Sequence, residues 1–453
     1  MERRKLTKED IDKVRNIEGF PIGTDEDIIA LSDASYYTAC PNPFIEEFIK
    51  ENGTPYDEAT DNYHREPFAA DVSEGKSDAI YNAHTYHTKV PHKAIMRYIL
   101  HYTNPGDIVL DGFCGTGMTG VAANMCAHPE KEFQMKIQHD MPYVNWGQRF
   151  PILNDLSPIA TLISRNYNAD FEISEFEHEA TQIIKDTYKE CGWMYQTAPT
   201  EDVQRSLVES FGSINYTVWS DVYICPHCGN EIVFYSAAAD PKTGKVEDSF
   251  SCSSCGASLK KRDCACAFDT YYDERLKETR KIVKQKPVLI CYQYAGKKYF
   301  KAPDEKDFSV LQKIDTMNIP YWYPTERMCE GKESRRNDKI GLTHVHHYFY
   351  KRTLVTLSKM FDLIRKSKHS DMLKIWFTSQ IINISKMNRY RPQVSFPYNP
   401  LSGTLYVSSM ISEANPFNAY EGKIKKFALA LKDNDGNKSC ISTGSTTQLL
   451  VPN

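Results

Sequence analysis

The fold is decided by the stretch Asp107-Ile-Val-Leu-Asp111-Gly-Phe-Cys-Gly115-Thr-Gly117-Met-Thr-Gly120. Its apolar run has the composition of a short, buried parallel strand. The glycines that follow have the G-x-G-x-x-G spacing, which allows a tight turn and lets a ligand approach the backbone before a helix begins. The stretch predicts a doubly wound α/β fold with a nucleotide-type cofactor at this turn. A glycine turn that binds no ligand is the alternative.

Two cofactors compete for the turn. A dinucleotide needs an acid about 20 residues further on, beside its ribose. Here Asp111 comes before the glycines, at the strand's end, where its carboxylate would face the positively charged methionine moiety of S-adenosylmethionine. The next strand-like run ends in Asp155, placed to accept hydrogen bonds from a ribose. Asp155 lies 44 residues after Asp111, too far for a compact dinucleotide unit unless residues 128–148 are an insertion.

Segments on both sides of the turn extend this pattern. Asn82-Ala-His84-Thr-Tyr-His87-Thr-Lys89-Val-Pro91 precedes a helical run at Ala94–Tyr102, and Asn154-Asp155-Leu-Ser157-Pro158 follows the second strand. Together with the glycine turn they resemble motif X, motif I and the second cofactor-contacting segment of amino-DNA methyltransferases. These enzymes methylate adenine N6 or cytosine N4 in double-stranded DNA with S-adenosylmethionine. More broadly, the chain is similar to site-specific adenine methylases with a zinc ribbon in their middle, from Tyr36 to Thr446.

The resemblance implies a role for each matched residue. The methionine end of the cofactor would be held by Asp111, Phe113, Gly115 and Gly117, and its ribose by Asp155. The methionine side would be closed by His87, Thr88 and Lys89.

One departure concerns the catalytic motif of this family, an acid, Asn or Ser followed by Pro-Pro and an aromatic residue. The sequence contains no Pro-Pro pair, and Asn42-Pro43-Phe44 and Asn415-Pro416-Phe417 each lack one proline, so no catalytic residue is assigned. In the family the motif follows a segment like Cys440–Asn453. We therefore expect an incomplete core, truncated or split before this motif. One alternative is a catalytically silent DNA-binding or scaffold half that pairs with a second polypeptide carrying the motif. The other is a nicotinamide-dependent oxidoreductase.

The cysteines give a second strong pattern. Cys225-Pro-His-Cys228-Gly and Cys252-Ser-Ser-Cys255-Gly are two C-x-x-C knuckles with 23 residues between their inner cysteines. Zinc prefers four tetrahedral thiolates, which paired knuckles supply. The spacing predicts a zinc ribbon. Between the knuckles, the run Glu231–Tyr235 and the polar turn at residues 240–244 together predict a hairpin.

Two further clusters are less specific. Residues 351–393 hold ten Lys or Arg against two acids, which suits either a DNA-contacting surface or a solvated helix face. His344-Val-His346-His347 suggests a metal site, but no acid at suitable spacing completes it, so a structural or surface role is expected.

Composition fits a cytoplasmic enzyme of about three domains. The chain has 453 residues, a net charge of -4 and thirteen cysteines, which favours metal binding in a reducing compartment over disulfides. It contains no run of 18 apolar residues, so no membrane span is expected. We expect an N-terminal arm at 1–80, the first part of the cofactor-binding core at 81–200, a zinc-ribbon insertion at 201–325 and a helical, DNA-contacting region at 326–453.

Overall fold

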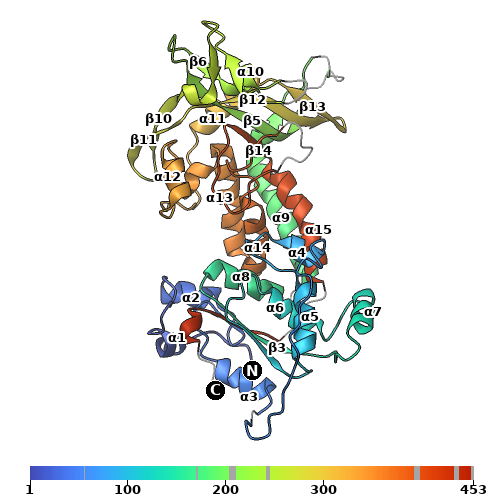
Figure 1. The fold of residues 1–453 in the computed structure, drawn as a ribbon. Helices are drawn as coiled ribbons and strands as arrows, with labels where there is room; N and C mark the ends of the chain where they lie inside the picture. Colours follow the sequence, from blue (N-terminus) through green and yellow to red (C-terminus); the bar gives the residue numbers. More distant parts are fainter. Residues whose placement is uncertain are drawn as a thin grey trace. The chain divides into compact units, whose positions relative to one another are not determined.

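The computed structural model divides the chain into two units (Figure 1). Unit 1 consists of Met1–His178, Asp371–Trp376 and Ile424–Asn453, and unit 2 consists of Glu179–Ser370 and Phe377–Lys423. The structure describes residues 1–55, 57–169, 172–201, 203, 211–240, 245–391, 398–432 and 438–449. The two units do not follow the boundaries of the four segments expected from the sequence. The division into four segments stays a prediction.

Unit 1 is a parallel sheet with helices around it. Its elements are α1 (Lys8–Val14), α2 (Asp25–Leu31), β1 (Tyr37–Thr38), α3 (Ile45–Asn52), α4 (Ala79–Ala83), α5 (His92–Tyr102), β2 (Ile108–Asp111), α6 (Met118–Met125), α7 (Lys131–Asp140), β3 (Phe150–Asp155), α8 (Pro158–Tyr167), β15 (Cys440–Thr443) and η4 (Thr446–Gln448). Three helices contain residues of both units: α9 (Ile173–Cys191), α14 (Ser370–Ile381) and α15 (Pro416–Leu431).

The sheet of unit 1 has the order β1-β15-β3-β2, and every pair is parallel. The two strands expected from the glycine stretch, β2 and β3, pair directly, with Leu110 opposite Ile152. β15 comes from near the end of the sequence and lies between β3 and β1. The predicted α/β class with a parallel sheet is confirmed.

Helices cover both faces of this sheet. Side chains alternate between faces along a strand, and paired residues of parallel strands share a face. Ile152 and Cys440 pack with Phe48 of α3 on one face. On the other face, α6 lies so close to β3 that a Cβ on Gly120 would meet Leu153 at 2.6 Å. The sheet is therefore doubly wound, as its apolar strands require.

Unit 2 is built on antiparallel strands. Its elements are η1 (Gly192–Tyr195), β4 (Gln196–Thr197), β5 (Gly212–Ile224), β6 (Glu231–Val233), α10 (Phe234–Ala238), β7 (Ser249–Ser251), β8 (Ser258–Lys260), η2 (Lys261–Asp263), β9 (Ala265–Cys266), β10 (Phe268–Asp273), β11 (Glu278–Val283), β12 (Gln285–Tyr294), β13 (Lys297–Lys301), α11 (Glu305–Asp315), α12 (Lys332–Asp338), η3 (Val345–Tyr348), α13 (Lys351–Lys366) and β14 (Met410–Ala414). The main sheet has the order β13-β12-β5-β14, with β4, β6 and β9 also paired to β5.

In the predicted hairpin, Glu231–Val233 forms β6, which pairs antiparallel with β5, and the chain then enters α10 at Phe234. The predicted turn is flanked by an antiparallel bridge between Ala239 and Val246, so Glu231–Tyr235 is not the strand that enters it. Of the predicted turn at 240–244, residues 241–244 lie outside the described residues. Within the described part of the chain, we find no helix long and apolar enough to cross a membrane.

Candidate functional site

The carboxylate of Asp155 fixes the glycine turn from the neighbouring strand. β2 and β3 are parallel, so the turn after β2 and the end of β3 meet at the carboxyl edge of the sheet. Asp155 Oδ2 accepts the backbone N–H of Gly115 at 2.9 Å, and Oδ1 accepts that of Ser157 at 2.9 Å. The acid expected beside a ribose thus also orients the turn.

Asp111 closes the other side of the turn. Its Oδ1 accepts the backbone N–H of Phe113 at 3.0 Å, and its Oδ2 accepts the hydroxyl of Thr119 at 2.5 Å. Each carboxylate oxygen has two lone pairs, so both retain acceptor capacity. Phe113 is 82% exposed, which leaves its ring available to a ligand. Asp111, Phe113, Gly115 and Asp155 are therefore brought together at one edge.

Two of the glycines are required by packing inside the protein. Gly117 has a φ of +73°, and a Cβ there would meet Ser164 Oγ at 2.2 Å. A Cβ on Gly120 would meet Asn168 Oδ1 at 2.4 Å. These glycines let α6 approach α8. At Gly115 a Cβ would meet only the ring of Tyr86, at 3.4 Å, so this backbone is the more open to a ligand.

The segment at His87–Lys89 approaches the turn through a residue that sequence reasoning missed. Tyr86 places its ring beside Gly115, whereas His87 and Thr88 are exposed, with Thr88 at a φ of 65°. The ammonium of Lys89 donates to the backbone oxygens of Tyr81 and His84, which closes the turn after α4. Tyr86 lies inside the segment Asn82–Pro91 that resembles motif X, so its position in that motif was the available signal.

The C-terminal segment of unit 1 also reaches the turn. The amide of Asn154 donates to Gly444 O at 2.9 Å and to Thr446 Oγ1 at 3.2 Å. The hydroxyl of Thr446 in turn donates to Gly112 O. β3, η4 and the glycine turn therefore form one hydrogen-bonded edge.

The four knuckle cysteines converge in unit 2. Cys225 Sγ lies 3.7 Å from Cys255 Sγ, and Cys228 Sγ lies 3.8 Å from Cys252 Sγ. All four sulfurs lie within 4.8 Å of one another. One knuckle is the turn between β5 and β6, the other the turn between β7 and β8. The backbone N–H groups of Cys255 and Ser254 lower the pKa of the Cys252 thiol, whereas desolvation and the neighbouring cysteine thiols raise that of Cys255.

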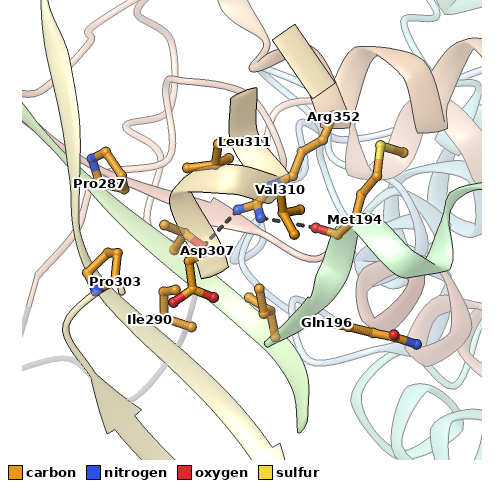
Figure 2. A pocket seen from close by; sticks show the side chains of 11 residues that line it. Met194, Gln196, Pro287, Ile290, Pro303, Asp307, Val310, Leu311 and Arg352 are labelled. Atoms are coloured by element: carbon orange, nitrogen blue, oxygen red, sulfur yellow. Dashed lines mark hydrogen bonds between the residues drawn. The ribbon is translucent and has the colours of Figure 1, made fainter. Parts of the chain in front are cut away.

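Two of the ten cations in the basic stretch at 351–393 are buried, Arg352 and Lys386, so they are not available to DNA. Arg352 pairs with Glu413 at 2.6 Å. Figure 2 shows Arg352 beside a small pocket, donating to Met194 O at 3.3 Å. Burial lowers the pKa of Lys386 to about 8. By contrast, Arg391 is exposed.

A comparison with known proteins supports this reading of unit 1. Residues 24–128 match the model of a family described as DNA methylase. The match includes the segment at His87–Lys89 and the glycine turn, and it confirms the resemblance to amino-DNA methyltransferases over that part of the chain. Neither the search of curated proteins nor the search of solved structures found a match.

Proposed function

Since a DNA methylase segment contains the glycine turn, we propose that the chain binds S-adenosylmethionine there for methylation of DNA, at adenine N6. Asp111, Phe113, Gly115 and Gly117 hold the methionine end, Asp155 holds the ribose, and His87, Thr88 and Lys89 close the methionine side. The observation that carries the proposal is the pair of carboxylates, Asp111 and Asp155, which end neighbouring parallel strands around an open glycine turn.

The site suits this cofactor in charge and in shape. Both carboxylates are half-buried and face no paired cation among the described residues, so they can attract a positively charged group. The backbone at Gly115 is open apart from Tyr86. When bound, the cofactor supplies an electrophilic methyl group, and the contribution of these residues is to hold it in line with a flipped base.

The catalytic Pro-Pro-aromatic motif comes, in this proposal, from another polypeptide segment that packs beside β2. Within the described part of the chain, β2 pairs on one side only, with β3. Leu110 in this strand is 52% exposed, although strands of a parallel sheet are normally buried. An added strand at this edge would bury Leu110 and bring the motif next to the glycine turn.

Binding of S-adenosylmethionine to the full chain, measured by calorimetry, tests the site. We expect binding that Asp111→Ala abolishes and that Asp107→Ala, at the opposite end of the strand, preserves. No binding, or equal loss in both variants, would refute the cofactor site. Methyl transfer to DNA by the chain without a second polypeptide would refute the proposal that the catalytic motif comes from elsewhere. It would not contradict the proposed cofactor site.

A second candidate is a catalytically silent DNA-binding half. The exposed Arg391 next to Tyr390 favours it, because cations and rings together suit phosphate contact and base stacking. DNA binding by a chain that does not bind S-adenosylmethionine, weakened by Arg391→Glu, would support this candidate over the methylase.

We further propose that Cys225, Cys228, Cys252 and Cys255 hold a structural zinc ion. Four converging thiols suit tetrahedral zinc, and reduced cysteines agree with a cytoplasmic location. Cys228→Ser should remove the ion, while Cys329→Ser, at an exposed cysteine outside the cluster, should retain it. Equal metal content in both variants would exclude the site.

A further inference from the structure

Unit 2 contains a second group of metal-ligating side chains, independent of the cysteines. Asp273 ends β10, and His346 and His347 lie in η3, more than seventy residues later. No sequence pattern predicts that these three residues meet, and the expectation that no acid accompanies the histidines is wrong. All three side chains are buried, with exposed fractions of 5%, 8% and 4%.

A single carboxylate oxygen lies between the two imidazoles. Asp273 Oδ2 is 2.9 Å from His346 Nε2 and 3.1 Å from His347 Nε2. The other oxygen, Oδ1, accepts the backbone N–H groups of Arg275 and Leu276, each at 3.1 Å. The turn after β10 therefore holds the carboxylate so that Oδ2 points at both histidines.

Hydrogen bonds to Asp273 do not satisfy every buried polar atom of this group. A bond to Asp273 uses one nitrogen of His346, and the other, Nδ1, is buried without a hydrogen-bond partner in the described part of the chain. Burying an unpaired polar atom costs free energy, because the atom loses its hydrogen bonds to water. Coordination of a metal ion at Nε2 of the same ring is strong enough to offset such a cost.

The distances are close to those of a metal site. Ligand atoms about 2.0–2.1 Å from a tetrahedral ion are separated by about 3.3 Å. Asp273 Oδ2 lies 2.9 and 3.1 Å from the two imidazole nitrogens, and all three ligand atoms lie within 4.8 Å of one another. In this structure His347 Nδ1 accepts the backbone N–H groups of Thr343 and His344, each at 3.3 Å. Coordination at Nε2 would shift the ring proton to Nδ1, where the hydroxyl of Thr343, 3.3 Å away, can accept it.

We propose that Asp273, His346 and His347 bind a divalent transition-metal ion such as Zn²⁺. Two imidazoles and a carboxylate are ligands that such ions accept. Three protein ligands leave one coordination position for water. The ion joins the turn after β10 to η3 and is separate from any ion held by the cysteines.

Metal content of the full chain tests this site. The protein is treated with a chelator, loaded with Zn²⁺ alone and dialysed before elemental analysis. We expect two ions per chain, one after His346→Gln or Asp273→Asn, and two after His344→Gln, the matched control beside the cluster. Cys228→Ser should also leave one ion, so failure of the cysteine site and failure of this site are distinguishable.

Unchanged metal content in both His346→Gln and Asp273→Asn would overturn the proposal. If these variants do not fold, loading the unaltered chain with Co²⁺ tests for the second metal site. We expect thiolate charge-transfer absorption from one Co²⁺ and, from a second, ligand-field bands without thiolate character. Absorption from thiolate-bound Co²⁺ alone would equally overturn it.

Discussion

Asp155 accepts the backbone N–H of Gly115 at 2.9 Å, so the end of β3 sets the conformation of the turn that follows β2. One carboxylate thereby links two neighbouring strands at the edge where a ligand would bind. Asp155 orients the turn and, in our proposal, also contacts the ribose, so its replacement should affect both the turn and the binding of the cofactor.

Asp155→Ala should weaken the binding of S-adenosylmethionine by about ten- to a hundredfold, since hydrogen bonds to a charged group contribute about 1.5–3 kcal/mol. Asp155→Asn keeps an acceptor oxygen and should lose less. Calorimetric titration of both variants measures this. The exposed Asp71→Ala provides the control, and an unchanged affinity in Asp155→Ala would contradict the assigned role.

Gly117→Ala should lower the free energy of unfolding by about 2–4 kcal/mol, because a non-glycine residue is strained at a φ of +73° and its Cβ would overlap Ser164 Oγ. Gly422 in α15 has no atom within 4 Å of its Cβ position and no positive φ. Gly422→Ala should therefore be stabilising by about 0.5–1 kcal/mol. Urea denaturation compares the two, and similar effects would show that the packing argument fails.

Glu413→Gln should cost about 3–5 kcal/mol, because it leaves the guanidinium of Arg352 charged and buried. The side chains of this pair are 4% and 0% exposed and meet at 2.6 Å. The pair between Lys366 and Asp362 has the same distance but lies 69% and 28% exposed. Asp362→Asn should therefore cost less than about 1 kcal/mol. Thermal and urea unfolding of both variants test whether the burial of an ion pair, rather than its distance, determines the loss of stability when one partner is replaced.

Acid should destabilise unit 1 through His92. Burial lowers the pKa of this histidine from 6.5 to about 4. Between these values the unfolded chain binds a proton that the folded chain does not. The free energy of unfolding should therefore fall as pH drops from 6.5 toward 4, by up to about 3 kcal/mol, with no contribution from His92 above pH 6.5.

His92→Leu should flatten this pH dependence, whereas His64→Leu, at an exposed position, should retain it. Unfolding free energies measured from pH 4 to 8 provide the comparison. A slope in His92→Leu equal to that of the unaltered chain would rule out this contribution.

Sequence alone predicted the strands that have a distinctive pattern within a short stretch of residues. β2 and β3 are apolar runs ended by an acid, and both are where the pattern predicts them. β1 and β15 have two and four residues and no distinctive pattern, so only their pairing in three dimensions reveals them.

The sites show the same contrast between features predicted from a local pattern and features revealed only by the structure. The cysteine knuckles were predicted because each pair is close in sequence and their spacing is specific. Asp273 was missed because its histidines are distant in sequence and a lone acid at the end of a strand carries no signal. The role of Asp155 in holding Gly115 was missed for a similar reason, since it depends on strand register.

The position of β15 affects how the protein is made. This strand lies between β1 and β3, yet the ribosome synthesises it after all of unit 2. During translation, the edges of β1 and β3 that pair with β15 therefore remain unpaired while the more than two hundred residues between β3 and β15 are synthesised. Any stall before Cys440 leaves the sheet in two pieces with open edges, the form of the chain most exposed to aggregation and to proteases.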